Sequence, residues 1–176
     1  MSELRKATTE QAYFLTFTVT QWVDVFTRSR YCDILIDSLQ FCQAHKKLEV
    51  YAYVIMTNHM HLIAAHPEGQ LSGVIRDFKS FTAKQIIRSI KQEPGESRRQ
   101  WLLHMFSYAA KYQQQNPQYL FWQKTSHPTE LYNAAIFQQK QHYIHQNPVT
   151  AGYVSEAHHW YYSSAHPSSP LPVTCL

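Results

Sequence analysis

The sequence has few cysteines and no long apolar run, and these shortages argue against whole classes of protein. Cys32, Cys42 and Cys175 are the three cysteines among 176 residues, and none forms a Cys-x-x-Cys pair. This argues against a disulfide framework and against a thiolate zinc site, and it favours a reducing compartment. No stretch reaches the length of a membrane span, and residues 1–6 lack the apolar core of a signal peptide. We therefore expect a cytoplasmic protein with no membrane partner.

Acidic residues are also scarce relative to basic ones. Twelve Asp and Glu residues stand against sixteen Lys and Arg residues, so the formal net charge is +4. An excess of this size permits binding to a polyanion but does not require it. Aromatic residues make up 14% of the chain, including twelve tyrosines. They suit stacking on unpaired bases, and they suit an ordinary aromatic core equally well.

The length and the 44% hydrophobic content predict one domain with a proper core, here residues 1–166, followed by a loose tail at 167–176. Periodicity predicts strands at 12–26, 50–56, 59–65 and 120–124, and helices at about 29–45, 71–92, 98–112 and 131–146. Pro148 is expected to stop the last helix. The order fits an α+β fold, a ferredoxin-like βαββαβ sandwich with an antiparallel sheet. A helical insert within 93–117 and an appended C-terminal helix would complete it.

The motif His59-Met60-His61 lies at the start of an expected strand. Side chains alternate along a strand, so both imidazoles would point to one face, about 6–7 Å apart, while Met60 and Leu62 enter a core. With both on the solvent side, the two histidines could converge on one metal ion. The alternative is two ordinary polar residues on the outer face of a hairpin, in a chain with eleven histidines.

A second pair of polar residues lies near the end of the last expected helix. Tyr143 and Asn147 are four residues apart and therefore share one helix face. If that helix lay over the histidines, Asn147 could give an oxygen ligand to the same metal, and Tyr143 could present its hydroxyl to a bound phosphate. The alternative is a tyrosine that only packs. Three other tyrosines lack an amide partner four residues on followed by a helix stop: Tyr119, Tyr132 and Tyr153.

The helix expected at 71–92 carries a basic face. Its cations include Arg76, Lys79, Lys84 and Arg88, with Asp77 as the only acid before Glu93. Such a face either binds phosphates or is simply solvated surface, and the sequence leaves both open.

Taken in order, these motifs resemble the single-tyrosine HUH transposases of small insertion sequences, and among them the REP-associated tyrosine transposase branch. The resemblance spans roughly residues 12–165 and rests on their order and spacing. The matching segments are 54–63 with its His-Met-His, 75–84, 121–124, the Tyr-Ile-His-Gln-Asn-Pro-Val of 143–149, 151–154 and 160–165.

The resemblance implies a specific chemistry. His59, His61 and Asn147 would bind a divalent metal, Mg²⁺ or Mn²⁺, and Tyr143 would be the nucleophile that forms a 5′-phosphotyrosine. The substrate would be single-stranded DNA beside a hairpin in a palindromic repeat, with Arg76, Lys79, Lys84 and Arg88 holding phosphates. The protein would be nucleoid-associated when bound to DNA. The resemblance also allows a homodimer in which the tyrosine completes the partner's site.

Two other functions are compatible with these motifs. One is a domesticated relative that binds DNA repeats on the same fold without cutting them. The other is a small structural protein that uses the histidine pair to hold a metal, which would give Tyr143 no role and predict no affinity for DNA.

Overall fold

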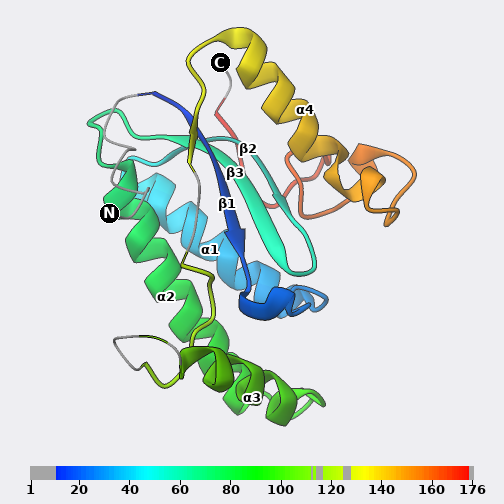
Figure 1. Ribbon diagram of the computed structural model, residues 1–176. Helices are drawn as coiled ribbons and strands as arrows, with labels where there is room; N and C mark the ends of the chain where they lie inside the picture. The colour runs from blue at the N-terminus through cyan, green and yellow to red at the C-terminus, as the bar shows by residue number, and fades with distance from the viewer. Residues whose placement is uncertain (1–10, 112, 114–116, 125–127, 175–176) are drawn as a thin grey trace.

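The computed structural model describes residues 11–111, 113, 117–124 and 128–174. Its centre is a sheet of four strands in the order β2-β3-β1-β4, with all neighbours antiparallel (Figure 1). The strands are β1 (Tyr13–Thr18), β2 (Glu49–Ile55), β3 (His59–Ala65) and β4 (Thr129–Glu130). This is the strand order of a ferredoxin-like sandwich, so the expected fold class is confirmed.

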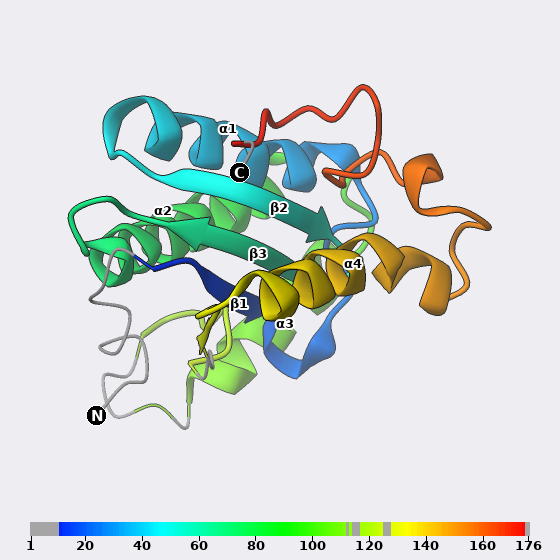
Figure 2. The same cartoon turned by 90° about the horizontal axis from the view of Figure 1, so that it is seen from above.

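Helices cover both faces of the sheet (Figure 2). On one face lie α1 (Ser29–His45) and α2 (Leu71–Gln92), and on the other lies α4 (Ala134–Thr150). The insert forms α3 (Arg99–Ala110), which packs against α2, and two short 3-10 turns are η2 (Thr20–Trp22) and η3 (Ala157–His159). The two-residue alternation of the strands explains the layers. Leu15, Phe17, Met60 and Leu62 enter the core under α1 and α2, while their neighbours in sequence face α4.

The fourth strand lies later in the chain than expected. Residues 120–124 form no regular strand and make a single bridge between Val19 and Trp122. The reason is packing, because Phe121 and Trp122 are buried against the ring of Phe26 beyond the end of β1. The edge of the sheet is therefore completed by the short β4 alone, beside β1.

Pro148 does not stop the last helix, which corrects the expectation from the sequence. The helix continues to Thr150 with Pro148 buried inside it. A proline removes only one backbone N–H donor from the helix. A well-packed helix can therefore include a proline close to its end. The end is set instead by Gly152, at φ 77°. There the N–H groups of Gly152 and Tyr153 donate to the carbonyls of Val149 and Pro148, both at 2.9 Å, in a Schellman motif. Asn147 is thus held in regular helical geometry.

The C-terminal segment is packed where a loose tail was expected. Leu171 is only 1% exposed, and the Thr174 N–H donates to the Val50 carbonyl at 2.7 Å. Side-chain amides of α1, from Gln40 and Gln43, donate to carbonyls of residues 170 and 172. The domain therefore extends at least to Thr174, and residues 175–176 lie outside the described part.

Within the described ranges, no helix combines the length and the apolar character that crossing a membrane requires.

Candidate active site

Strand β3 presents His59 and His61 toward α4. Their ring centroids are 4.8 Å apart, which agrees with the shared face expected from alternation. That face is not open to solvent, however, because α4 covers it. His61 is 5% exposed and His59 is half-buried. The histidine pair therefore lies in an interface between sheet and helix.

Two residues of β1 fix the ring of His61. Thr16 lies directly opposite it in the strand register, and the Thr16 hydroxyl is hydrogen-bonded to Nδ1 at 2.9 Å. The ring of Phe14 stacks on the imidazole at 5.2 Å. The other ring nitrogen, Nε2, is buried and has no hydrogen-bond partner among the described residues. A buried polar atom without a partner is costly, and a metal ion would satisfy this one.

His59 is oriented by a chain of polar groups from the loop after β1. The Asn58 Nδ2 donates to Asp24 Oδ1 at 2.9 Å, which turns the amide oxygen of Asn58 toward His59. That oxygen can only accept, so His59 Nδ1, at 2.7 Å, carries the proton. Nε2 of the neutral ring then keeps its lone pair, the form that a metal requires. Asn147 of α4 lies close enough to the His59 side chain to act on its pKa, in the raising direction.

Both imidazoles are held in the neutral form. Burial, reinforced by His59 and by the charge of Lys140, lowers the pKa of His61 to about 3. Burial also lowers the pKa of His59, against the opposing effects of Asn147 and Asp24. Metal ligation needs deprotonated imidazole, so the pair is ready for a cation at neutral pH. Two imidazoles and the amide of Asn147 form a donor set that fits a divalent ion such as Mn²⁺ or Mg²⁺.

Helix α4 brings Tyr143 to the histidines of the same chain. The rings of Tyr143 and His61 are 5.2 Å apart, and Tyr143 is 47% exposed, so it can be reached from outside. The helix is anchored by Phe137 and Ile144, which belong to one buried cluster with Val54 and other side chains of the sheet. The structure thus gathers all four expected catalytic residues, with Tyr143 and Asn147 on the helix and the histidines beneath.

Four residues near this site carried little signal in the sequence. Thr16 is part of the polar alternation of β1, and Lys140 is one helical turn before Tyr143, so both could have been found once α4 was placed. The Nζ of Lys140 lies 4.8 Å from the Phe14 ring and 5.8 Å from the Tyr143 ring. Asp24 and Asn58 are far apart in sequence, and no local pattern connects them.

The four cations of α2 are not brought to the histidine pair, because α2 packs on the opposite face of the sheet. Arg76 is exposed and bonds to Asp77, and Lys84 and Arg88 are exposed farther along the helix. Lys79 turns inward, and its Nζ donates to the Gln123 carbonyl at 3.0 Å. Burial lowers the pKa of Lys79 to about 8. Their role in DNA binding stays a prediction, and for Lys79 the structure supplies a different partner.

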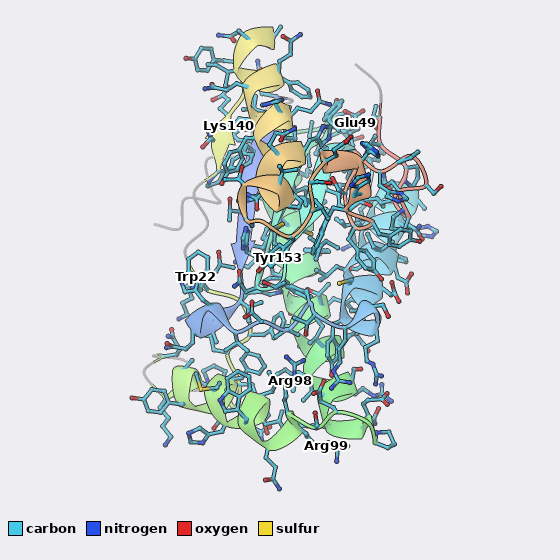
Figure 3. The ribbon with its side chains drawn as sticks, turned by 90° about the vertical axis from the view of Figure 1, so that its right-hand side faces the viewer. Trp22, Glu49, Arg98, Arg99, Lys140 and Tyr153 are labelled. Carbon is cyan, nitrogen blue, oxygen red and sulfur yellow. The ribbon has the colours of Figure 1, made fainter. Side chains whose placement is uncertain are left out.

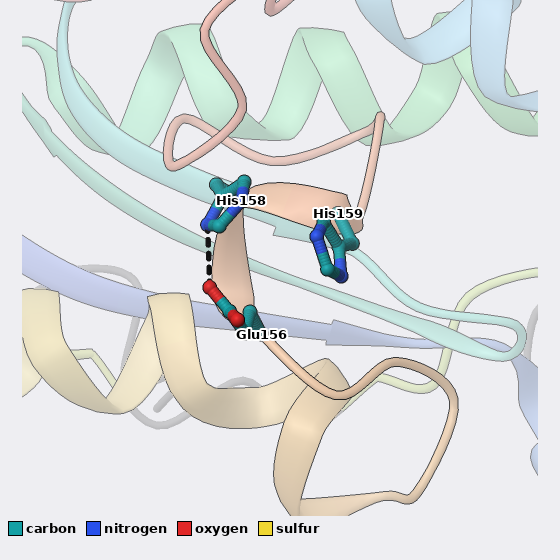
Figure 4. Close-up of side chains that lie close together, drawn as sticks. All are labelled: Glu156, His158 and His159. Carbon is teal, nitrogen blue, oxygen red and sulfur yellow. Dashed lines mark ion pairs between the residues drawn. The ribbon is translucent and has the colours of Figure 1, made fainter.

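A second set of potential metal ligands lies in and just before η3, on the segment after α4 (Figure 4). The ligand atoms of Glu156, His158 and His159 all lie within 4.8 Å of one another, and His158 Nδ1 is 3.3 Å from Glu156 Oε2. All three side chains are exposed. Because of this exposure, the set lacks the buried, unpaired nitrogen that distinguishes the histidine pair.

Comparisons with known proteins agree with this geometry. The family model described as "Transposase IS200 like" matches residues 7–116. A solved structure described as a REP-associated tyrosine transposase bound to a REP hairpin is similar, with a TM-score of 0.61 and 21% identity over 89% of this chain and 78% of that chain. No curated protein sequence gives a significant match. The family match includes the histidine motif and ends before α4, so the helix with Tyr143 is supported by fold similarity and geometry.

Proposed function

The chain belongs to the IS200-like transposase family, and from that premise we propose that it cleaves and rejoins single-stranded DNA with Tyr143 as the nucleophile. One observation carries the proposal. The Tyr143 ring lies 5.2 Å from His61, whose buried Nε2 has no partner among the described residues. A nucleophile and an available ligand atom thus face each other across the interface of α4 and β3.

The residues have separate tasks in this proposal. His59, His61 and Asn147 would hold a divalent ion, Mg²⁺ or Mn²⁺. When bound, that ion would polarise the scissile phosphate and offset the charge that develops on it. Thr16 and Asn58 would hold the two imidazoles in orientation, as hydrogen-bond partners of metal ligands do. Lys140, whose Nζ is 5.8 Å from the Tyr143 ring, would attract the phosphate toward the phenol.

The reaction is a transesterification. The Tyr143 oxygen attacks phosphorus and loses its proton, the bond from phosphorus to the 3′-oxygen breaks, and that oxygen takes up a proton. The products are a 5′-phosphotyrosine and a free 3′-hydroxyl. Because one phosphodiester replaces another, the linkage keeps the energy needed for a 3′-hydroxyl to reverse the step and rejoin strands.

Intramolecular placement supports catalysis within one chain. Tyr143, Lys140 and the histidine pair meet without a second copy, so we propose that a homodimer is not required for cleavage. The hairpin bound by the similar transposase supports a hairpin beside the single strand as the DNA partner of this chain.

The test is formation of a covalent adduct. The protein is incubated with Mn²⁺ and hairpin oligonucleotides that carry single-stranded flanks. We expect a denaturation-resistant protein–DNA band that Tyr143→Phe abolishes, while DNA binding persists. Tyr132→Phe, at an exposed tyrosine before α4, is the matched control and should retain the band. An undiminished band in Tyr143→Phe would refute the assignment.

The metal ligands are tested with the same substrate. His59→Ala should abolish the adduct and weaken Mn²⁺ binding, whereas His158→Ala, in the exposed set, should change neither. Adduct formation by the wild type in EDTA would contradict the metal role. If the wild type binds the hairpin tightly and never forms an adduct, the non-catalytic repeat-binding function replaces this proposal.

A further inference from the structure

Trp22 is held outward at the end of β1 by an unusual backbone. Its side chain is 60% exposed, although indoles are costly to leave in water. Gln21 and Trp22 have φ of 56° and 54°, in the left-handed region that residues other than glycine seldom adopt. Such conformations persist where the surroundings impose them, and they gather at ligand-binding sites.

The surroundings of this turn are rigid. The Thr20 N–H donates to the Phe121 carbonyl at 2.8 Å, and the Trp22 N–H donates to the Val19 carbonyl at 3.1 Å. Val19 and Thr20 are themselves buried. The indole is therefore fixed by its backbone and is largely free of packing on its own faces, which leaves it available to stack on a ligand.

The indole lies beside the candidate active site. Its ring is 6.0 Å from the ring of His59. The His59 and His61 rings are 4.8 Å apart, and the His61 and Tyr143 rings are 5.2 Å apart. Figure 3 shows Trp22 projecting beyond the end of β1, in the space between α4 and α3. A strand of DNA whose phosphate reached the histidine pair would pass this indole.

A hollow of about 420 Å³ adjoins Trp22. Its wall includes three glutamines, Gln21, Gln113 and Gln123, together with Lys124. The Nε2 of Gln123 also donates to the Val19 carbonyl at 3.4 Å. Amides both donate and accept, which suits the edges of bases. An indole face suits stacking on a base, and a lysine suits a phosphate. The volume is within the range of sites for small ligands.

We propose that Trp22 and this hollow bind one unpaired base of the DNA strand, next to the phosphate at the histidine pair. The inference rests on the proposed function, because that function places the phosphate there. The occupant is an unpaired base, since a base inside a duplex has its faces stacked and its pairing edge occupied. The site would position the strand for cleavage and contribute to choosing the nucleotide beside the cut.

The test measures binding in EDTA, so that cleavage does not contribute. The probe is a hairpin oligonucleotide with single-stranded flanks, whose stem fixes the register, and a set of copies with one abasic position each. We expect Trp22→Ala to weaken binding of the intact probe by roughly 5- to 150-fold, the range expected when one base is no longer stacked. Trp22→Phe should restore most of the affinity. The control is Trp101→Ala, at an exposed tryptophan of α3, which should bind as the wild type does.

Stacking on one particular base makes one further prediction. One abasic position should weaken binding to the wild type and have no effect on Trp22→Ala, because both changes remove the same interaction. Equal sensitivity of the two proteins at every position, or unchanged affinity of Trp22→Ala, would overturn the proposal. Trp22→Gly accepts the backbone angle and also lacks the indole, so it gives the same test if the alanine variant does not fold.

The adduct assay separates this inference from the proposed function. A wild-type adduct without any Trp22-dependent position would refute the base site alone. A Trp22-dependent position without any adduct would refute Tyr143 catalysis and keep the base site. Absence of single-strand binding by the wild type would refute both.

Discussion

Lys79 provides a sharp test, because its structure conflicts with its expected role as a phosphate ligand. The ammonium group donates to the Gln123 carbonyl at 3.0 Å and lies 5.9 Å from the Phe17 ring. Burial lowers its pKa from 10.5 to about 8. We predict that Lys79→Met, which keeps the length and apolar character of the stem, stabilises the protein and leaves DNA binding unchanged.

The magnitude follows from the pKa. At about 1.4 kcal/mol per pKa unit, a lysine pKa lowered from 10.5 to about 8 means that keeping the charge at pH 7 costs about 3.5 kcal/mol. Removing the hydrogen bond to the carbonyl offsets part of this, typically about 1.5–3 kcal/mol for a charged donor. We therefore expect a net gain of about 0.5–2 kcal/mol for Lys79→Met at pH 7.

The sign of the pH dependence is also fixed. Below pH 8 both the folded and the unfolded wild type carry the proton, so the gain of Lys79→Met is constant. Between about pH 8 and 10.5 the unfolded chain keeps the proton that the folded protein has lost, so wild-type stability rises relative to the variant. The advantage of the variant should therefore shrink across this interval.

The assay is urea unfolding of both proteins from pH 7 to pH 10.5, followed by tryptophan fluorescence. Lys84→Met, at an exposed lysine of the same helix, is the control and should change stability by less than about 0.5 kcal/mol at any pH. Hairpin binding across a salt series should have the same slope for Lys79→Met and the wild type. A pH-independent effect would refute the buried cation, and a shallower slope would show that Lys79 does reach DNA.

Two further predictions concern the metal site and the basic helix. Thr16→Val removes the hydroxyl at His61 Nδ1 and keeps the shape of the side chain. The affinity for Mn²⁺, measured by calorimetry, should therefore fall about 10- to 100-fold. An unchanged affinity would mean that the hydrogen bond from Thr16 does not orient His61. Joint replacement of Arg76, Lys84 and Arg88 by alanine should lower the slope of log affinity against log salt by about 0.7 for each single-strand phosphate that the helix no longer binds, and an unchanged slope would show that this face of α2 is solvated surface.

The sequence was a good guide to elements whose residues follow a local period. The alternation around His59, Met60, His61 and Leu62 predicted the strand and its two faces correctly. The helical spacing of the apolar residues in 29–45 and 71–92 predicted α1 and α2 at almost their observed ends. The apolar face of a strand or helix can be predicted from the sequence, because burying that face is favourable whichever element packs against it.

Predictions from local sequence preferences were wrong where tertiary packing overrode those preferences. Pro148 was expected to end a helix, yet burial of its ring and the turn at Gly152 carry the helix past it. Residues 167–174 were expected to be loose because of their prolines, yet Leu171 fills the core and backbone carbonyls there accept from α1. Lys79 belongs to a basic face by spacing, yet its stem is long enough to turn the charge inward.

The sequence by itself determined which atoms are available: two imidazoles on one strand face, and a phenol and an amide on one helix face. Only the tertiary structure decided that these faces meet within one chain, since α4 could have crossed the sheet elsewhere or joined a second copy. Packing of Phe137 and Ile144 on the sheet fixes that crossing. Burial beneath α4 then makes His61 neutral and leaves its Nε2 without a partner among the described residues. Neither property can be predicted from the sequence pattern.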